Sequence, residues 1–237
     1  LVIHPHDNDL IAGTHGRGIW ILDDITPLQQ ASTKVMSAEA HMFENGRPGT
    51  HWLSLRRGGY GRGNLYFAGE NPAPGLPIHF YLRDKQDGPV EIDITDATGA
   101  LKTKYSVKDA EPGINRLMWD MRFDPPAERL KQNLTQMQQM MDRILQRPEV
   151  EEEPKKTVQK ALEKLKQPGL SYREAAEIQR KAFEAIGFGG FGRFRGRGRG
   201  MGATEAEPGT YAVKLTVNGK TYAGKVAVRQ DPMLSEK

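Results

Sequence analysis

The sequence predicts a mainly β protein with an α-helical insertion, and three observations carry this prediction. Short segments with period-2 alternation, bounded by Gly, Pro, Asn and Asp turns, occur at both ends of the chain. The tetrapeptide Ala-Glu-Pro-Gly occurs at 110–113 and again at 206–209, and each copy opens a strand pattern. The segment between the two copies has helical periodicity instead. We therefore expect a β domain that is interrupted after Arg122 and resumes at Gly209.

Composition limits the kinds of chemistry available to the chain. The 237 residues contain no cysteine, which excludes disulfides, thiol catalysis and cysteine metal sites. The net charge of +4 is mild and does not require an anionic partner. No apolar run approaches the roughly 20 residues of a membrane span. Because Leu1 already lies in a strand pattern, we expect a fragment whose upstream part, including any signal peptide, is missing.

Residues 1–28 are expected to form a β-meander. Three apolar runs at 1–3, 10–12 and 19–22 are separated by turn-forming clusters. Three short strands are too few for independent stability, so the meander needs a partner surface.

A resemblance follows from the second half of this segment. Residues 13–28 read Gly-Thr-His-Gly-Arg-Gly-Ile-Trp-Ile-Leu-Asp-Asp-Ile-Thr-Pro-Leu. This resembles the final blade of large secreted bacterial β-propellers of the sortilin-like, neuraminidase-repeat (BNR, Asp-box) class. In such repeats the third strand runs into an Asp-box, Ser-x-Asp-x-Gly-x-Thr-Trp. Here Asp-Asp-Ile-Thr-Pro stands in its place at 23–27, as expected of a chain that leaves the propeller.

Residues 29–75 are expected to be a linker that leaves the blade. A short helix fits 29–36, and a Gly/Arg-rich surface loop fits 56–63. The turn cluster at 67–75 is a natural domain boundary. In the same secreted family, a segment resembling 69–75 precedes the next domain.

Residues 76–123 and 204–230 are expected to form a β-sandwich. Six alternating segments are separated by turns at sandwich spacing, including hairpin turns at Asp96–Gly99 and Asn218-Gly219. The order of motifs resembles the immunoglobulin-like domain of flagellar hook-capping proteins. The residues that carry this resemblance are Asp96, Gly99, Pro112, Gly113, Asn115, Trp119, Asp120, Pro208, Gly209, Thr210, Tyr211, Asn218 and Gly219.

The insertion is expected to be helical over 124–187 and without fixed structure over 188–203. Apolar residues recur three and four apart in three successive segments, and Ser171 with Glu174 forms a capping-box pattern at the start of the third. Residues 188–203 are rich in Gly and Arg and have no periodicity.

Candidate binding residues come from two places. His15 and Arg17 lie in a turn of the meander beside Trp20, where propellers present ligand-contacting loops. Trp20, Trp52 and Trp119 are most simply explained as core or interdomain anchors. The second place is the Arg-Gly tract, in which arginines interleaved with phenylalanines could neutralise phosphates and stack on bases. Its arginines are Arg193, Arg195, Arg197 and Arg199.

Catalytic and metal sites are not favoured by the pattern. Paired carboxylates could indicate a glycosidase, with Asp23, Asp24, Asp93, Asp96 and Asp120 as the candidates. Neighbours in a strand point to opposite faces, and aspartates beside turns commonly bond the backbone, so structural roles are preferred. His4 and His6 have no acidic pattern near them to complete a metal site. We predict no catalytic residue, metal or cofactor.

The resemblance implies that the chain is the non-catalytic C-terminal portion of a secreted or periplasmic bacterial β-propeller protein. The resemblance implies a binding role, with protein or glycan ligands and with the upstream propeller as the partner within the chain. The first alternative is the accessory tail of a propeller glycoside hydrolase, which would make the full-length protein an enzyme. The second alternative is RNA binding through the Arg-Gly tract, which the rest of the pattern does not favour.

Overall fold

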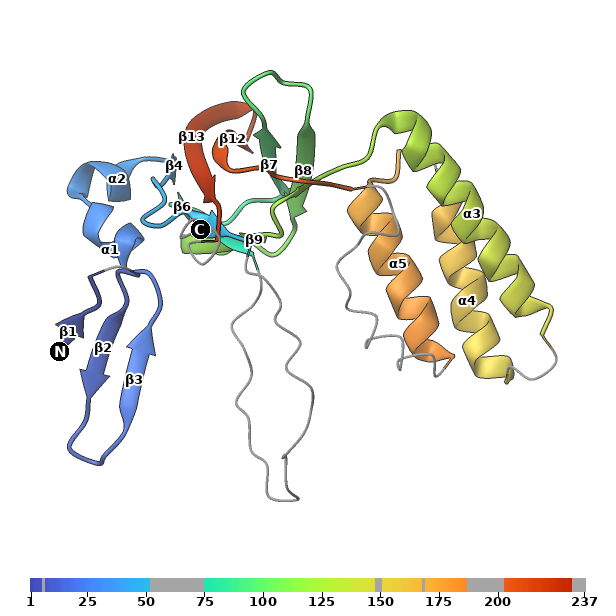
Figure 1. Cartoon of the computed structure of the whole chain (residues 1–237), viewed down its shortest axis with the longest axis horizontal. Coiled ribbons are helices and arrows are strands. Elements are labelled where there is room, and N and C mark those ends of the chain that lie inside the picture. The colour runs from blue at the N-terminus through green and yellow to red at the C-terminus, as the bar shows by residue number, and fades with distance from the viewer. Residues whose placement is uncertain (6, 52–74, 148–150, 168, 187–202, 232–237) are drawn as a thin grey trace. The chain divides into compact units, whose positions relative to one another are not determined.

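The computed structural model describes residues 1–5, 7–51, 75–147, 151–167, 169–186 and 203–231 (Figure 1). The chain is mainly β, with several sheets and a few helices. It divides into two compact units. One comprises Leu1–Arg122 with Glu205–Lys237, and the other comprises Phe123–Thr204. Candidate residues Arg193, Arg195, Arg197 and Arg199 lie outside the described residues, as does Trp52.

The N-terminal meander forms as the sequence predicts. Strands β1 (Val2–Ile3), β2 (Leu10–Gly13) and β3 (Ile19–Leu22) make an antiparallel sheet in that order. The turns between them rely on positive φ at Asn8 (58°) and Arg17 (64°). Asparagine tolerates this left-handed conformation, whereas arginine adopts it at some cost.

A five-stranded sheet has the order β5-β13-β12-β7-β8. Its strands are β5 (Gly49–Thr50), β7 (Val90–Thr95), β8 (Lys102–Val107), β12 (Gly209–Val217) and β13 (Lys220–Arg229). All neighbours are antiparallel except β5 and β13, which are parallel. Asn218 (φ 49°) and Gly219 (φ 76°) close the β12–β13 hairpin, as expected of an Asn-Gly type I′ turn.

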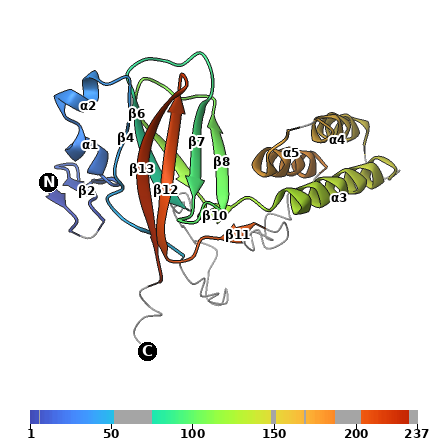
Figure 2. The same ribbon diagram turned by 90° about the horizontal axis from the view of Figure 1, so that it is seen from above.

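A three-stranded sheet faces it, with the order β4-β6-β9 (Figure 2). Its strands are β4 (Ala40–Met42), β6 (Leu76–Leu82) and β9 (Gly113–Trp119). The Trp119 ring lies edge-on to Tyr211 of β12, with centroids 5.4 Å apart. Trp119 is fully buried and its indole N–H donates to the Arg122 carbonyl at 3.1 Å, so the prediction that it anchors a core is confirmed.

Residues 29–75 are more than the linker that the sequence predicts. Within the described part of this segment, β4 pairs with β6 and β5 pairs with β13, so the chain contributes strands to both facing sheets. The single expected helix is replaced by two short ones, α1 (Thr26–Gln30) and α2 (Thr33–Ser37). Strands of two or three residues are too short to show alternation, and only tertiary pairing creates them.

The second unit contains the three expected helices, α3 (Ala127–Leu145), α4 (Glu152–Leu165) and α5 (Tyr172–Ala185). Their apolar stripes meet in a separate core that includes Met141, Val158, Leu165 and Ala175. Ser171 and Glu174 form the expected capping box. The ends of the insertion are joined by a ribbon of β10 (Arg122–Phe123) and β11 (Thr204–Glu205). None of the helices that the structure describes is long and apolar enough to cross a membrane.

Candidate functional site

The meander carries the three sequence-predicted binding residues that the structure describes. His15 and Arg17 are exposed in the turn between β2 and β3, and Trp20 of β3 is 72% exposed. The turn is held by hydrogen bonds between its own residues, because Thr14 N–H donates to the Gly18 carbonyl at 2.9 Å and Gly18 N–H donates to the Thr14 side-chain Oγ1 at 3.1 Å. Because its side chain is mostly exposed, Trp20 does not serve as a core residue within the described part of the chain.

The sheet is apolar on both faces. In β3, Ile19 and Ile21 point to one face while Trp20 and Leu22 point to the other, and all four are more than half exposed. Strand β1, at the opposite edge of the sheet, is similar, with Val2 64% and Ile3 49% exposed. A strand that is apolar on both faces is typical of a sheet covered on both sides.

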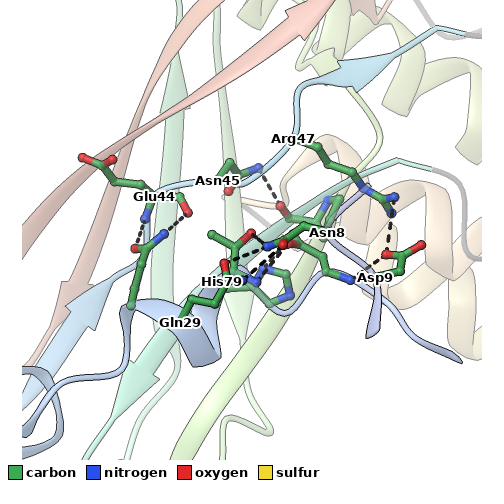
Figure 3. Close-up of polar contacts among 11 residues, drawn as sticks. Asn8, Asp9, Gln29, Glu44, Asn45, Arg47 and His79 are labelled. Carbon is green, nitrogen blue, oxygen red and sulfur yellow. Dashed lines mark hydrogen bonds and ion pairs between the residues drawn. The ribbon is translucent and has the colours of Figure 1, made fainter. Parts of the chain in front are cut away.

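The meander is attached to the facing sheets through a buried carboxylate, Asp24, which follows β3. Asp24 adopts a positive φ of 48° and is only 6% exposed. Its N–H donates to Asp9 Oδ1 at 2.9 Å, and its Oδ1 accepts from Thr26 N–H at 3.2 Å. Its Oδ2 lies 4.0 Å from Nδ1 of His79, a buried residue of the central strand β6. The residues around His79 are shown in Figure 3.

A second group of contacts joins the first meander turn to α1. Asn8 Nδ2 donates to Thr26 Oγ1 at 2.8 Å and to Gln29 Oε1 at 3.0 Å. The Arg47 guanidinium lies 3.5 Å from Asp7 and 3.9 Å from Asp9. These bonds fix the turn against the segment that follows β3.

The loop after β4 completes this attachment. Gln30 exchanges two hydrogen bonds with the Glu44 backbone, donating to its carbonyl at 2.9 Å and accepting from its N–H at 3.0 Å. Asn45 Nδ2 donates to the Pro77 carbonyl of β6 at 2.8 Å (Figure 3). Gly46 lies so close to the anchor that a Cβ there would be 1.9 Å from Thr26 Oγ1.

We call residues 24–39, which precede β4, and residues 43–47, which follow it, the anchor segment. It covers one face of β6, since every residue of that strand is buried and Tyr81 donates to the Met36 carbonyl at 2.9 Å. The other face of β6 belongs to the core between the two sheets.

Two histidines lie on the face of the β4-β6-β9 sheet that the anchor segment covers. His41 of β4 pairs with Tyr81, and its ring packs edge-on against Phe43 at 5.1 Å. Burial lowers the pKa of His41. Burial also lowers the pKa of His79, where Asp24 opposes the shift and Arg116 and Arg47 add to it. Both imidazoles are therefore neutral at pH 7.

Three of the five carboxylates considered for catalysis accept hydrogen bonds from the backbone. Asp96 accepts from Leu101 N–H at 3.0 Å across its hairpin, and Asp120 accepts from Arg122 N–H at 3.2 Å. Asp24 is occupied as described above. In the described ranges, no three His, Asp or Glu side chains are grouped so as to hold a metal ion. The contacts of Asp24 with Asp9, Thr26 and His79 join the meander to the facing sheets.

Sequence reasoning missed the anchor. His79, Asn45 and Arg47 carry no motif, because their partners lie far away in the sequence. The Asn45-Gly46 pair was the one local signal, since such pairs favour tight turns. In the sequence, Asp24 stands out only as half of a carboxylate pair.

Comparisons with protein-family models, with curated proteins and with solved structures find no match for this chain.

Proposed function

We propose that the chain is the non-catalytic C-terminal part of a secreted or periplasmic bacterial β-propeller protein, with β1–β3 as strands of its last blade. The observation that carries this proposal is the meander, whose β3 exposes apolar side chains on both faces. Propeller blades are sheets packed between neighbouring sheets, so their strands are apolar on both sides.

The apolar surface is large enough to drive such packing. Six side chains of β1 and β3 are between 49% and 73% exposed. Complete burial of one large aliphatic or aromatic side chain contributes about 1.5–3 kcal/mol, so covering these six would contribute on the order of 10 kcal/mol. A glycan stacked on Trp20 would cover one face only. Packing between protein sheets therefore accounts for the pattern better, and protein or glycan ligands are assigned to the complete propeller.

The two facing sheets would serve as the support for this blade, and we propose that they form an immunoglobulin-like sandwich. The order β4-β6-β9 against β5-β13-β12-β7-β8, with β5 parallel to β13, is consistent with that class. Tyr211 adds support, because its hydroxyl donates to the Glu207 carbonyl at 2.6 Å. A tyrosine that bonds back to the backbone in this way is similar to the tyrosine corner of such domains.

The proposal is tested by reading the coding sequence upstream of Leu1. Repeated Asp-boxes behind a signal peptide are the expected result, and they would direct all ligand work to the upstream part. A carboxylate pair on one face of that propeller would favour the hydrolase alternative. A start codon at Leu1 with no upstream repeats would overturn the proposal.

A further inference from the structure

We propose that the covered face of β4 and β6 is a pH-sensitive attachment, which holds the anchor segment and meander at neutral pH and releases them when His41 and His79 become protonated. The proposal concerns chain 1–237 itself and does not depend on the propeller assignment.

The positions of the two histidines support this proposal. His79 is 8% exposed and His41 is half-buried, and both lie on the sheet face that the anchor segment covers. The polar contacts that join the anchor segment to β6 and the meander surround His79 (Figure 3). A charge that appears on either ring must therefore be hydrated at the expense of that packing.

The charged groups that face His79 also support the proposal. Asp24, from the turn before α1, favours the protonated ring, with its carboxylate 4.0 Å away. Arg116 from β9 and Arg47 from the loop after β4 disfavour it. Arg47 is itself held by Asp7 and Asp9. Burial and the two arginines together outweigh Asp24, since the pKa of His79 is lowered overall.

The surroundings of His41 differ. A cavity of about 760 Å³ beside it is lined by Glu44 and Lys225 among other residues. Tyr81 of β6 lies opposite His41. Burial is the cause of the lowered pKa of His41.

The sign of the effect follows from these directions. Both histidines have a pKa below the ordinary 6.5 while the anchor is closed, so the closed state binds fewer protons than the open one. Their contribution to closure is complete above about pH 6.5 and is lost as the pH falls below it. At pH 5.5, one unit below 6.5, protonation can raise the equilibrium constant for opening of the anchor segment by at most about tenfold per histidine.

The test is hydrogen exchange of chain 1–237 at pH 7.5 and pH 5.5, corrected for the intrinsic pH dependence of exchange. We expect amides of residues 25–37 to lose several-fold to about a hundredfold of their protection at pH 5.5, while amides of β12 keep theirs. The H41Q/H79Q variant should lose this pH dependence. The matched variant H15Q, changed in the exposed meander turn, should retain it.

Three results would overturn the proposal. These are wild-type protection that does not change with pH, a pH dependence that persists in H41Q/H79Q, and an equal loss in β12, which would indicate global unfolding. If H41Q/H79Q does not fold, NMR titration of the imidazoles in the wild-type chain decides. Values below 6.5 for both His41 and His79, together with the selective loss of protection at residues 25–37, support the proposal, and a value at or above 6.5 for either overturns it.

Discussion

Gly46→Ala should loosen the anchor without disturbing the two facing sheets. A Cβ at this position would lie 1.9 Å from Thr26 Oγ1 and 3.0 Å from Asp24 Oδ1. The loop or Thr26 must therefore move, and overpacking of this kind costs about 1–3 kcal/mol. Thr26 Oγ1 also accepts the 2.8 Å bond from Asn8, and losing that bond adds about 0.5–1.5 kcal/mol.

We therefore expect the anchor segment to open about 30-fold more often in Gly46→Ala, which corresponds to about 2 kcal/mol. Hydrogen exchange of residues 25–37 measures this opening directly. Gly16→Ala is the matched control, because its Cβ would meet nothing within 4 Å. In the double variant Gly46→Ala/Thr26→Ala, removal of the hydroxyl should recover about 1 kcal/mol relative to additive single effects. Equal protection in Gly46→Ala and Gly16→Ala would refute the close contact between the loop and α1.

The remaining predictions concern the sheets and the insertion. Trp119→Ala should lower the free energy of unfolding by about 3–5 kcal/mol in urea denaturation, because the ring is fully buried. Trp20→Ser should change the free energy of unfolding by less than about 0.5 kcal/mol. Equal effects of the two substitutions would contradict the assigned core. Asn218→Ala places alanine at a φ of 49° and should cost about 1 kcal/mol in the same assay, and an unchanged midpoint would count against the type I′ turn. Deleting residues 125–203 should leave a cooperatively melting β unit, since the helices have their own core; loss of cooperative melting in calorimetry would show that the insertion is needed for folding.

Local signals in the sequence were sufficient for much of the fold. Asn218-Gly219 and Asp96–Gly99 place hairpins because turn chemistry acts over a few residues. The apolar stripes of α3, α4 and α5 are similarly local, with a period that the sequence displays directly. The three short strands of the meander were visible for the same reason.

The elements that escaped prediction depend on distant partners. Strand β5 is two residues long and exists because it pairs with β13, about 180 positions later in the sequence. The contact between Asp24 and His79 joins two residues with no motif between them. Of the candidate site, the exposure of His15 and Arg17 followed from their turn, whereas the apolar exposure of Trp20 required knowing that nothing in the described chain covers β3.

The most direct test of the propeller assignment is the accessibility of Trp20 in the whole gene product compared with chain 1–237. Acrylamide quenching of tryptophan fluorescence is measured for wild type and for Trp20→Phe in each protein. The difference between the two reports on the Trp20 ring without the contributions of Trp52 and Trp119. We predict efficient quenching in chain 1–237, where the ring is 72% exposed, and strong protection in the whole gene product. Equal quenching in both proteins would show that no further sheet covers β3, and would contradict the assignment of the meander to a propeller blade.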